Sequence, residues 1–164
     1  MRKYIALAMV FSILILPMVS ATTYWMNAVD ELNLAEKDSS WNIIEGGASG
    51  IIKFTTITRF GRLIQQRAQV KVYGLEPKTK YQLIYYGNEE NNDVWPYATC
   101  IGKPRMTSTR GYFSSGSSQV NHLQMRDDGV AQKFWVVSAS DVDCGQEKMI
   151  AWNPSEYLFE TNTI

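Results

Sequence analysis

The feature that most constrains the fold is the regular succession of short alternating segments after Gly46. In residues 64–74, Ala68, Val70 and Val72 fall on one face and charged or amide side chains on the other, which is the two-residue period of a half-buried strand. Further segments of strand character, separated by glycine, proline, asparagine and aspartate, are 49–57, 81–86, 97–102, 111–116, 132–140 and 156–161. Short strands at this spacing predict an all-β antiparallel sandwich or barrel.

The beginning of this region is ambiguous. In residues 27–44, Val29, Leu32 and Leu34 have a rough helical spacing, and Asp38-Ser39-Ser40 has the composition of a turn. Such a pattern is compatible with a short N-terminal helix and equally with an irregular edge strand. Both alternatives stay open at this point.

The N-terminus has the organisation of a secretory signal. Arg2 and Lys3 precede an apolar run of roughly 15 residues, and Val19-Ser20-Ala21 places small residues at the −3 and −1 positions of a cleavage site. The alternative is an uncleaved membrane anchor, but a spanning helix needs about 20 apolar residues, more than this run contains. We therefore expect residues 1–21 to be a cleaved signal peptide and residues 22–164 to be a single secreted domain.

The charge of this mature chain argues against one class of partner. Removing Arg2 and Lys3 with the leader leaves 14 basic against 16 acidic residues, a net charge of −2. A nucleic-acid-binding protein needs a basic patch, so we expect no nucleic-acid partner. There is also no second apolar segment of spanning length, so the product is expected to be extracellular, or held at the cell envelope by a partner.

The two cysteines, Cys100 and Cys144, form one candidate pair. In a secreted protein an even cysteine count predicts a disulfide, and two cysteines allow only one pairing. The alternative, a nucleophilic or metal-binding thiol, would require histidine or acidic partners. We expect the disulfide.

A motif at residues 74–81 narrows the fold class. Leu75, Pro77, Thr79 and Tyr81 stand at alternate positions after a strand that ends near Tyr73, and this Gly-Leu-x-Pro-x-Thr-x-Tyr pattern resembles the tyrosine corner of fibronectin type III and other immunoglobulin-like domains. In that motif the tyrosine hydroxyl returns to the backbone a few residues upstream. The resemblance implies an immunoglobulin-like antiparallel sandwich of about seven strands, and it implies no activity.

A second resemblance covers most of the mature chain. It is similar to an uncharacterised family of small secreted proteins from methanogenic archaea. The matching positions are Tyr81, Tyr85, Tyr86, Trp95, Pro96, Cys100, Gly111, Asp141, Asp143, Cys144, Trp152, Pro154, Tyr157 and Phe159. Residues 58–69 and the "NEENND" loop depart from the family pattern. The resemblance implies an extracellular sandwich with a Cys100–Cys144 bridge, again without an activity.

The inventory of reactive residues does not favour an enzyme. His122 is the single histidine and lies in a polar segment, where a lone histidine builds neither a nucleophile–base pair nor a typical zinc site. Asp141 and Asp143 would share a strand face, but next to Cys144 we expect them in a turn, accepting backbone N–H groups. We therefore expect no catalytic residues.

The composition of one loop makes it a weakly supported candidate for a calcium site. Glu89, Glu90 and Asp93 lie in a run of oxygen donors, and Ca²⁺ prefers six to eight oxygen ligands. The spacing is not that of an EF-hand, and a solvated acidic loop is the alternative that we favour. No cofactor is expected.

The aromatic residues provide the best functional hint, since the chain contains five tryptophans. Trp135 lies within an apolar strand and is expected in the core, and Trp152 near the bridge. Trp95 and Tyr97 flank Pro96 beside the acidic loop and are expected to be exposed. Our first interpretation is a non-catalytic module that contacts extracellular or envelope proteins. The alternative is a carbohydrate-binding module using Trp95 and Tyr97, with a polysaccharide as the partner.

Overall fold

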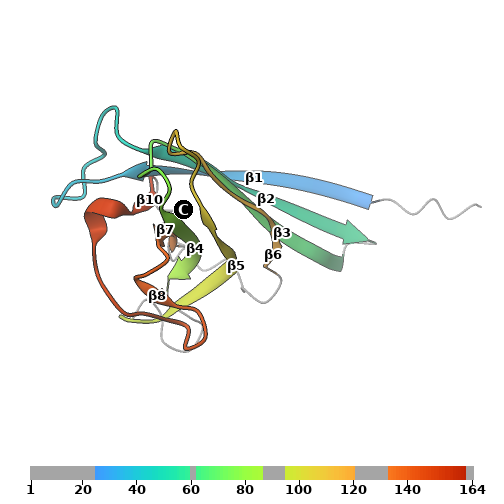
Figure 1. Ribbon diagram of the computed structural model, residues 1–164. Coiled ribbons are helices and arrows are strands. Elements are labelled where there is room, and N and C mark those ends of the chain that lie inside the picture. Colours follow the sequence, from blue (N-terminus) through green and yellow to red (C-terminus); the bar gives the residue numbers. More distant parts are fainter. Residues whose placement is uncertain (1–24, 60–61, 87–94, 121–132, 162–164) are drawn as a thin grey trace, which may run out of the picture.

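The computed structural model describes residues 25–59, 62–86, 95–120 and 133–161 (Figure 1). The signal peptide predicted at residues 1–21 lies outside this part of the chain. The described elements are β1 (Trp25–Glu36), β2 (Ser49–Arg59), β3 (Arg62–Tyr73), β4 (Lys80–Tyr86), β5 (Ala98–Met106), β6 (Phe113–Gln119), β7 (Lys133–Ser138), β8 (Val142–Asp143), β9 (Lys148–Met149), the 3-10 turn η1 (Pro154–Glu156) and β10 (Leu158–Glu160). The all-β prediction is thus confirmed.

Eight of the strands form a single antiparallel sheet in the order β5-β4-β7-β10-β1-β2-β3-β6. The two end strands, β5 and β6, pack against each other, so that the sheet is a nearly closed roll. Gly102 on β5 has a φ of +70°, and a Cβ at this position would collide with the Ser118 side chain on β6. The positive φ, together with the close approach of these two strands, favours glycine here.

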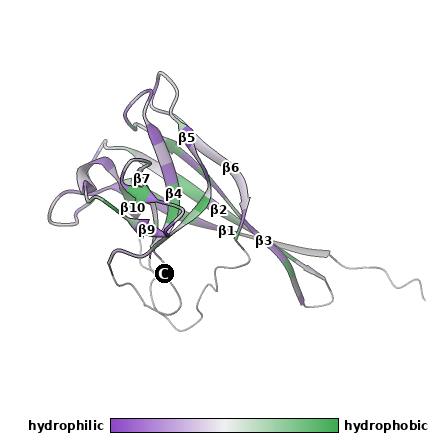
Figure 2. Ribbon diagram, turned by 60° about the horizontal axis from the view of Figure 1, so that its bottom comes forward, coloured by the Kyte–Doolittle hydropathy of each residue, from purple (hydrophilic) through white to green (hydrophobic). Residues whose placement is uncertain are grey.

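This topology differs from the predicted sandwich of about seven strands. An immunoglobulin-like sandwich has two separate sheets, whereas here hydrogen bonding runs continuously through eight strands, and β8 and β9 form a two-stranded ribbon. The seven predicted segments all contain strands. The predicted division into two sheets is not confirmed, because the long β1, β2 and β3 bend together and carry the pairing from one side of the roll to the other (Figures 1 and 2).

The ambiguous N-terminal segment forms a strand up to Glu36, so the helix alternative is wrong. β1 pairs with β2 over residues 25–35 and with β10 only over residues 34–36, so it lies inside the strand order of the sheet although most of its length has a partner strand on one side only. Leu32 and Leu34 are buried, because alternate residues of a strand share a face. No helix in the described part of the chain is long and apolar enough to cross a membrane.

The roll encloses the main hydrophobic core. Its interior is filled by residues from every strand of the large sheet, among them Ile52, Val70, Leu83, Phe134 and Val136, which are at most 1% exposed. Figure 2 shows the hydrophobic colouring concentrated on the strands that surround this interior. The alternation predicted for Ala68, Val70 and Val72 is confirmed, since all three are fully buried.

A second core lies on the outer face of β4 and β7. Ile84, Trp135 and Val137 on these strands pack with Met149 and Tyr157 of the segment 141–157, which crosses the outside of the roll. β4 and β7 are therefore buried on both faces, which explains why their sequences are almost continuously apolar. This covering segment leaves part of the outer face open, and the candidate site lies there.

Candidate functional site

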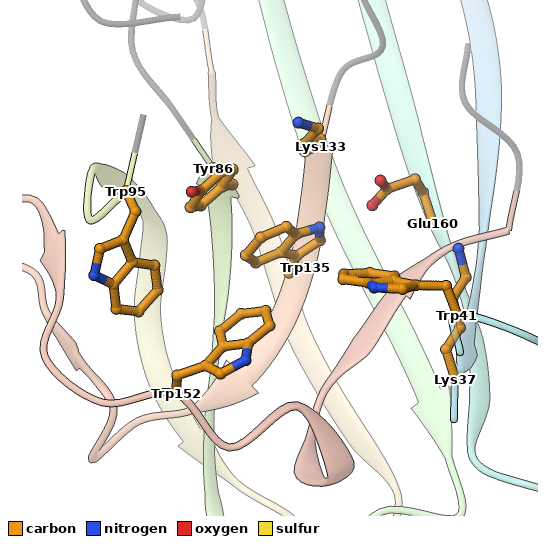
Figure 3. A pocket seen from close by; sticks show the side chains of 8 residues that line it. All are labelled: Lys37, Trp41, Tyr86, Trp95, Lys133, Trp135, Trp152 and Glu160. Carbon is orange, nitrogen blue, oxygen red and sulfur yellow. The ribbon is translucent and has the colours of Figure 1, made fainter. Parts of the chain in front are cut away.

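An open pocket of about 780 Å³ lies beside the second core (Figure 3). This volume is in the range of sites for small organic ligands. The described residues that line it are Lys37, Trp41, Tyr86, Trp95, Lys133, Trp135, Trp152 and Glu160. Four of the eight are tryptophans, so the pocket is an aromatic one.

The floor of the pocket is a stacked aromatic pair. Tyr86 and Trp135 project from neighbouring strands, β4 and β7, with ring centroids 4.2 Å apart and ring planes within 17°. Trp135 is supported from below by Phe159 of β10, at 5.3 Å. Both Trp135 and Phe159 are at most 5% exposed. Because these rings are packed into the core, they form a rigid base for whatever binds above them.

Trp95 and Trp152 form one wall of the pocket. Their rings are 5.7 Å apart in an edge-to-face arrangement, and Trp152 also contacts Trp135 at 5.8 Å. The two side chains are 47% and 42% exposed. Half-exposed indoles that are braced by other rings present flat apolar faces at a low cost in side-chain entropy.

A partly buried hydrogen-bond network holds the segment that carries Trp152. The carboxylate of Asp141 accepts from the Tyr157 hydroxyl at 2.6 Å and from the Asn153 amide at 2.8 Å, while the Asn153 N–H donates to the Tyr157 oxygen. Burial and the hydrogen bond to Asp141 raise the pKa of Tyr157. Trp152 lies directly before Asn153, so this network determines where its indole stands.

Trp41 forms the opposite wall and lies on a tight turn between β1 and β2. Asp38 caps this turn by accepting from the backbone N–H groups of Ser40 and Asn42, and these bonds lower the pKa of its carboxyl group. Trp41 has a φ of 65°, which is costly for a bulky residue and is commonly found where a side chain is held for function. Its ring contacts Phe159 at 4.9 Å, so the strained backbone directs the indole onto the aromatic base.

Glu160 is the acidic residue among the described lining residues, and it is only 7% exposed. Burial raises its pKa from 4.5 to about 7, against the opposing effect of its own backbone N–H and of the charges of Lys37 and Lys133. Glu160 Oε2 and Trp135 Nε1 are both buried and have no hydrogen-bond partner among the described residues. A buried carboxyl group without full hydrogen bonding is costly when ionised, so this residue lowers stability at neutral pH.

This cost predicts a pH-dependent effect of Glu160→Gln. The folded pKa lies above the unfolded value of 4.5, so the stability of the wild type falls as pH rises from about 4.5 to about 7. At 1.36 kcal/mol per pKa unit the full effect is about 3 kcal/mol. Glutamine stays neutral throughout. We therefore expect Glu160→Gln to match the wild type near pH 4 and to exceed its unfolding free energy by up to about 3 kcal/mol at pH 8.

Urea denaturation at the two pH values measures this difference. Glu45→Gln is the matched control, because Glu45 is exposed and does not line the pocket. At each pH, the unfolding free energy of each variant is compared with that of the wild type. If Glu160→Gln and Glu45→Gln show the same difference from the wild type at pH 4 and again at pH 8, the assigned cost of ionising Glu160 is wrong.

The residues predicted from the sequence are partly brought together by the structure. Trp95 lines the pocket, as shown in Figure 3, but Tyr97, which is 37% exposed, does not. Tyr97 instead pairs through its backbone with Lys148. The calcium candidates Glu89, Glu90 and Asp93, and also His122, lie outside the described residues. Within the described part of the chain no group of three or more His, Cys, Asp or Glu side chains is arranged to hold a metal ion.

The disulfide is present and joins β5 to the end of β8, with the Cα atoms of Cys100 and Cys144 5.5 Å apart. The two aspartates beside it differ. Asp143 accepts from the N–H groups of Gly145 and Gln146, the expected turn. Asp141 was expected to bind backbone N–H groups, but its carboxylate accepts from side chains instead, because it is buried under the segment that returns to β10.

The corner motif packs at the end of the main core. Leu75 and Tyr81 are buried there, while Pro77 is exposed. The backbone of Glu76 hydrogen-bonds the Tyr81 hydroxyl, and burial raises the pKa of this tyrosine. Thr79 donates its N–H to the Thr107 hydroxyl at 3.0 Å. These contacts join the β3–β4 connection to the end of β5.

Several pocket residues were not assigned to a site from the sequence, namely Lys37, Trp41, Tyr86, Lys133, Trp135, Trp152 and Glu160. The tryptophan content was the available signal, since of the four tryptophans in the pocket only Trp135 belongs to the two cores. The fold brings these residues together from positions 37 to 160. Comparison of the chain with protein-family models, with curated proteins and with solved structures finds no match.

Proposed function

We propose that this protein is a non-catalytic extracellular binding module and that its aromatic pocket binds carbohydrate. The observation that carries the proposal is the arrangement of Trp41, Trp95 and Trp152 around the stacked Tyr86–Trp135 floor. The apolar face of a sugar ring packs against an indole, and polar groups at the rim of such a site fix its orientation. Lys37, Lys133 and Glu160 provide those polar groups.

Secretion is part of the same proposal. It rests on the signal-like residues 1–21 and on the disulfide, a bond that persists in oxidising compartments. A relation to immunoglobulin-like or fibronectin type III domains rests on the corner at Leu75–Tyr81, and a relation to the archaeal secreted family on the sequence resemblance.

Trp95→Ala tests the site directly. We expect it to weaken saccharide binding at least ten-fold, about 1.4 kcal/mol, because it removes one wall of the pocket. The melting temperature should change little, since Trp95 is 47% exposed and truncating surface residues usually costs little stability. The measurement is retention of the purified protein on a panel of insoluble polysaccharides, together with thermal unfolding.

Tyr97→Ala is the matched control, because it removes a neighbouring exposed aromatic side chain that does not line the pocket. Equal losses in the two variants would contradict the assignment of the pocket as the site. A large drop in melting temperature for Trp95→Ala would mean that this indole has a structural role.

A second candidate function is protein binding. Ile43 and Ile44 are 54% and 39% exposed on the same turn as Trp41, and exposed apolar side chains gathered on one surface often mark protein interfaces. In this case the partner is an extracellular protein or an envelope component. Retention on cell envelopes that is lost after protease treatment, and lost in an Ile43→Ser/Ile44→Ser variant while Trp95→Ala is unaffected, would favour this candidate over carbohydrate.

A further inference from the structure

The exposed aromatic side chains of the pocket do not share a plane. The rings of Trp95 and Trp152 meet at 82°, and the ring of Trp152 is inclined to that of Trp135 by 55°. Figure 3 shows the ring of Trp41 almost edge-on and that of Trp95 almost face-on, so the two opposite walls are also inclined to each other. A flat surface therefore cannot lie against the faces of Trp95 and Trp152 at the same time.

The nearly parallel rings of Tyr86 and Trp135 lie on the floor of the pocket and not at its rim. Their planes are within 17° of each other, but the two side chains are only 8% and 5% exposed. The side chains of Trp41, Trp95 and Trp152, in contrast, are 42% to 55% exposed. A flat surface resting on these outer indoles would be held away from the floor. Only a group that enters the hollow between the walls reaches the stacked pair.

Contacts within the protein oppose a rearrangement that would make the outer indoles coplanar. The ring of Trp152 packs edge-to-face on Tyr157 at 5.6 Å and lies 6.2 Å from the ring of Phe159. The next residue, Asn153, is held by the hydrogen bond from its N–H to the Tyr157 hydroxyl. The ring of Trp41 packs at 61° on Phe159. Turning either indole would break these aromatic contacts, so the inclined walls belong to the folded structure.

We propose that the pocket binds separated polysaccharide chains, in solution or in amorphous material, and does not bind the face of a crystalline polysaccharide. This inference rests on the proposed carbohydrate binding. In a crystal, neighbouring chains present a flat face, which fits a row of coplanar aromatic side chains. A separated chain places a sugar ring in the hollow, where the ring packs against the floor and against the inclined indoles of Trp95 and Trp152.

The test compares physical forms of the same polymer, so that the chemistry of the sugar is constant. Cellulose, chitin, mannan and β-1,3-glucan are each offered to the purified protein as crystalline particles, as acid-swollen amorphous particles and as soluble hexasaccharides. For at least one polymer, we expect retention on the amorphous form to be ten-fold or more greater, per unit of accessible surface, than on the crystalline form. The matching hexasaccharide should release the protein from the amorphous particles and should change its tryptophan fluorescence in solution.

Two variants locate chain binding in the pocket. Trp95→Ala and Trp152→Ala should each weaken hexasaccharide binding at least ten-fold, because a chain between the walls contacts both indoles. Tyr97→Ala is the control and should bind as the wild type does, since this exposed aromatic residue does not line the pocket. Circular dichroism confirms that each variant is folded, and Trp95→Ala decides the result if Trp152→Ala does not fold.

The outcomes separate this inference from the proposed function. Equal or greater retention on the crystalline form, without release by the hexasaccharide, overturns the preference for separated chains and leaves carbohydrate binding in place. Hexasaccharide binding that is unchanged in Trp95→Ala overturns the placement of the chain in the pocket. Absence of binding to every form of every polysaccharide overturns both the inference and the proposed function.

Discussion

Replacing both Cys100 and Cys144 by alanine is expected to lower the free energy of unfolding by about 2 to 4 kcal/mol. The bond joins residues 44 positions apart, and cross-links of this length stabilise by restricting the unfolded chain. It also fastens the β8–β9 ribbon, which has only two residue pairs of its own, to β5. The Tyr97–Lys148 bridge and the backbone hydrogen bonds from Ala98 N–H to Glu147 and from Met149 N–H to Pro96 also hold this ribbon, so we expect the loss toward the lower end of the range.

Chemical denaturation of the wild type, of the double variant and of the reduced wild type measures this effect. The reduced wild type is the control, because it has lost the bond while keeping both side chains, and it should unfold close to the double variant. If the double variant unfolds within about 0.5 kcal/mol of the oxidised wild type, the ribbon is held by its packing alone and the stabilising role of the disulfide is contradicted.

Asp141→Ala is the second large effect that we expect. The change deletes the acceptor of the Tyr157 hydroxyl and of the Asn153 amide. Tyr157 is fully buried, whereas Asn153 is exposed and its amide can bind water instead. Buried polar groups left without a partner cost about 1 to 3 kcal/mol each. We therefore expect a loss of about 1 to 3 kcal/mol in the free energy of unfolding, mainly from the Tyr157 hydroxyl, measured by urea denaturation.

The same variant should also weaken ligand binding, because the network sets the position of Trp152 in the pocket. Asp143→Ala is the matched control. It lies two residues away and its carboxylate caps an exposed turn, where the loss of such bonds costs about 1 kcal/mol or less. Equal losses of stability in the two variants would contradict the assignment of Asp141 as the residue that anchors this segment.

The local structure of most strands follows from the sequence for a simple reason. In β3 the alternation of Ala68, Val70 and Val72 with polar residues matches the two faces of a strand that is buried on one side. β7 reads as an unbroken apolar run, because the roll covers one face and the segment 141–157 the other. The disulfide could also be predicted from the sequence, since two cysteines allow one pair.

The N-terminal strand could not be predicted from the sequence in this way. Val29, Leu32 and Leu34 fit a helical spacing and an extended one, and local preference does not separate the two. Strand pairing makes this segment extended, because β1 hydrogen-bonds to β2 on one side and to β10, the last strand of the chain, on the other. Contacts between residues more than 100 positions apart leave no local signature in the sequence.

The pocket, too, could be predicted only in part from the sequence. The content of tryptophan and the exposure of Trp95 could be anticipated from residues that stand near one another in the chain. The stacking of Tyr86 on Trp135, the left-handed backbone of Trp41 and the burial of Glu160 could not. Each of these depends on which strands become neighbours in the roll, and the sequence did not predict that eight strands would form one sheet.

The sequence by itself determined where most strands form and which two cysteines pair, because these depend on the period of apolar residues along a short segment and on a count. The tertiary structure alone decided how the strands are ordered, that Trp95 and not Tyr97 faces the pocket, and that a carboxyl group lies buried between two lysines. These features arise from packing between distant segments, where burial and neighbouring charges set the properties of each side chain.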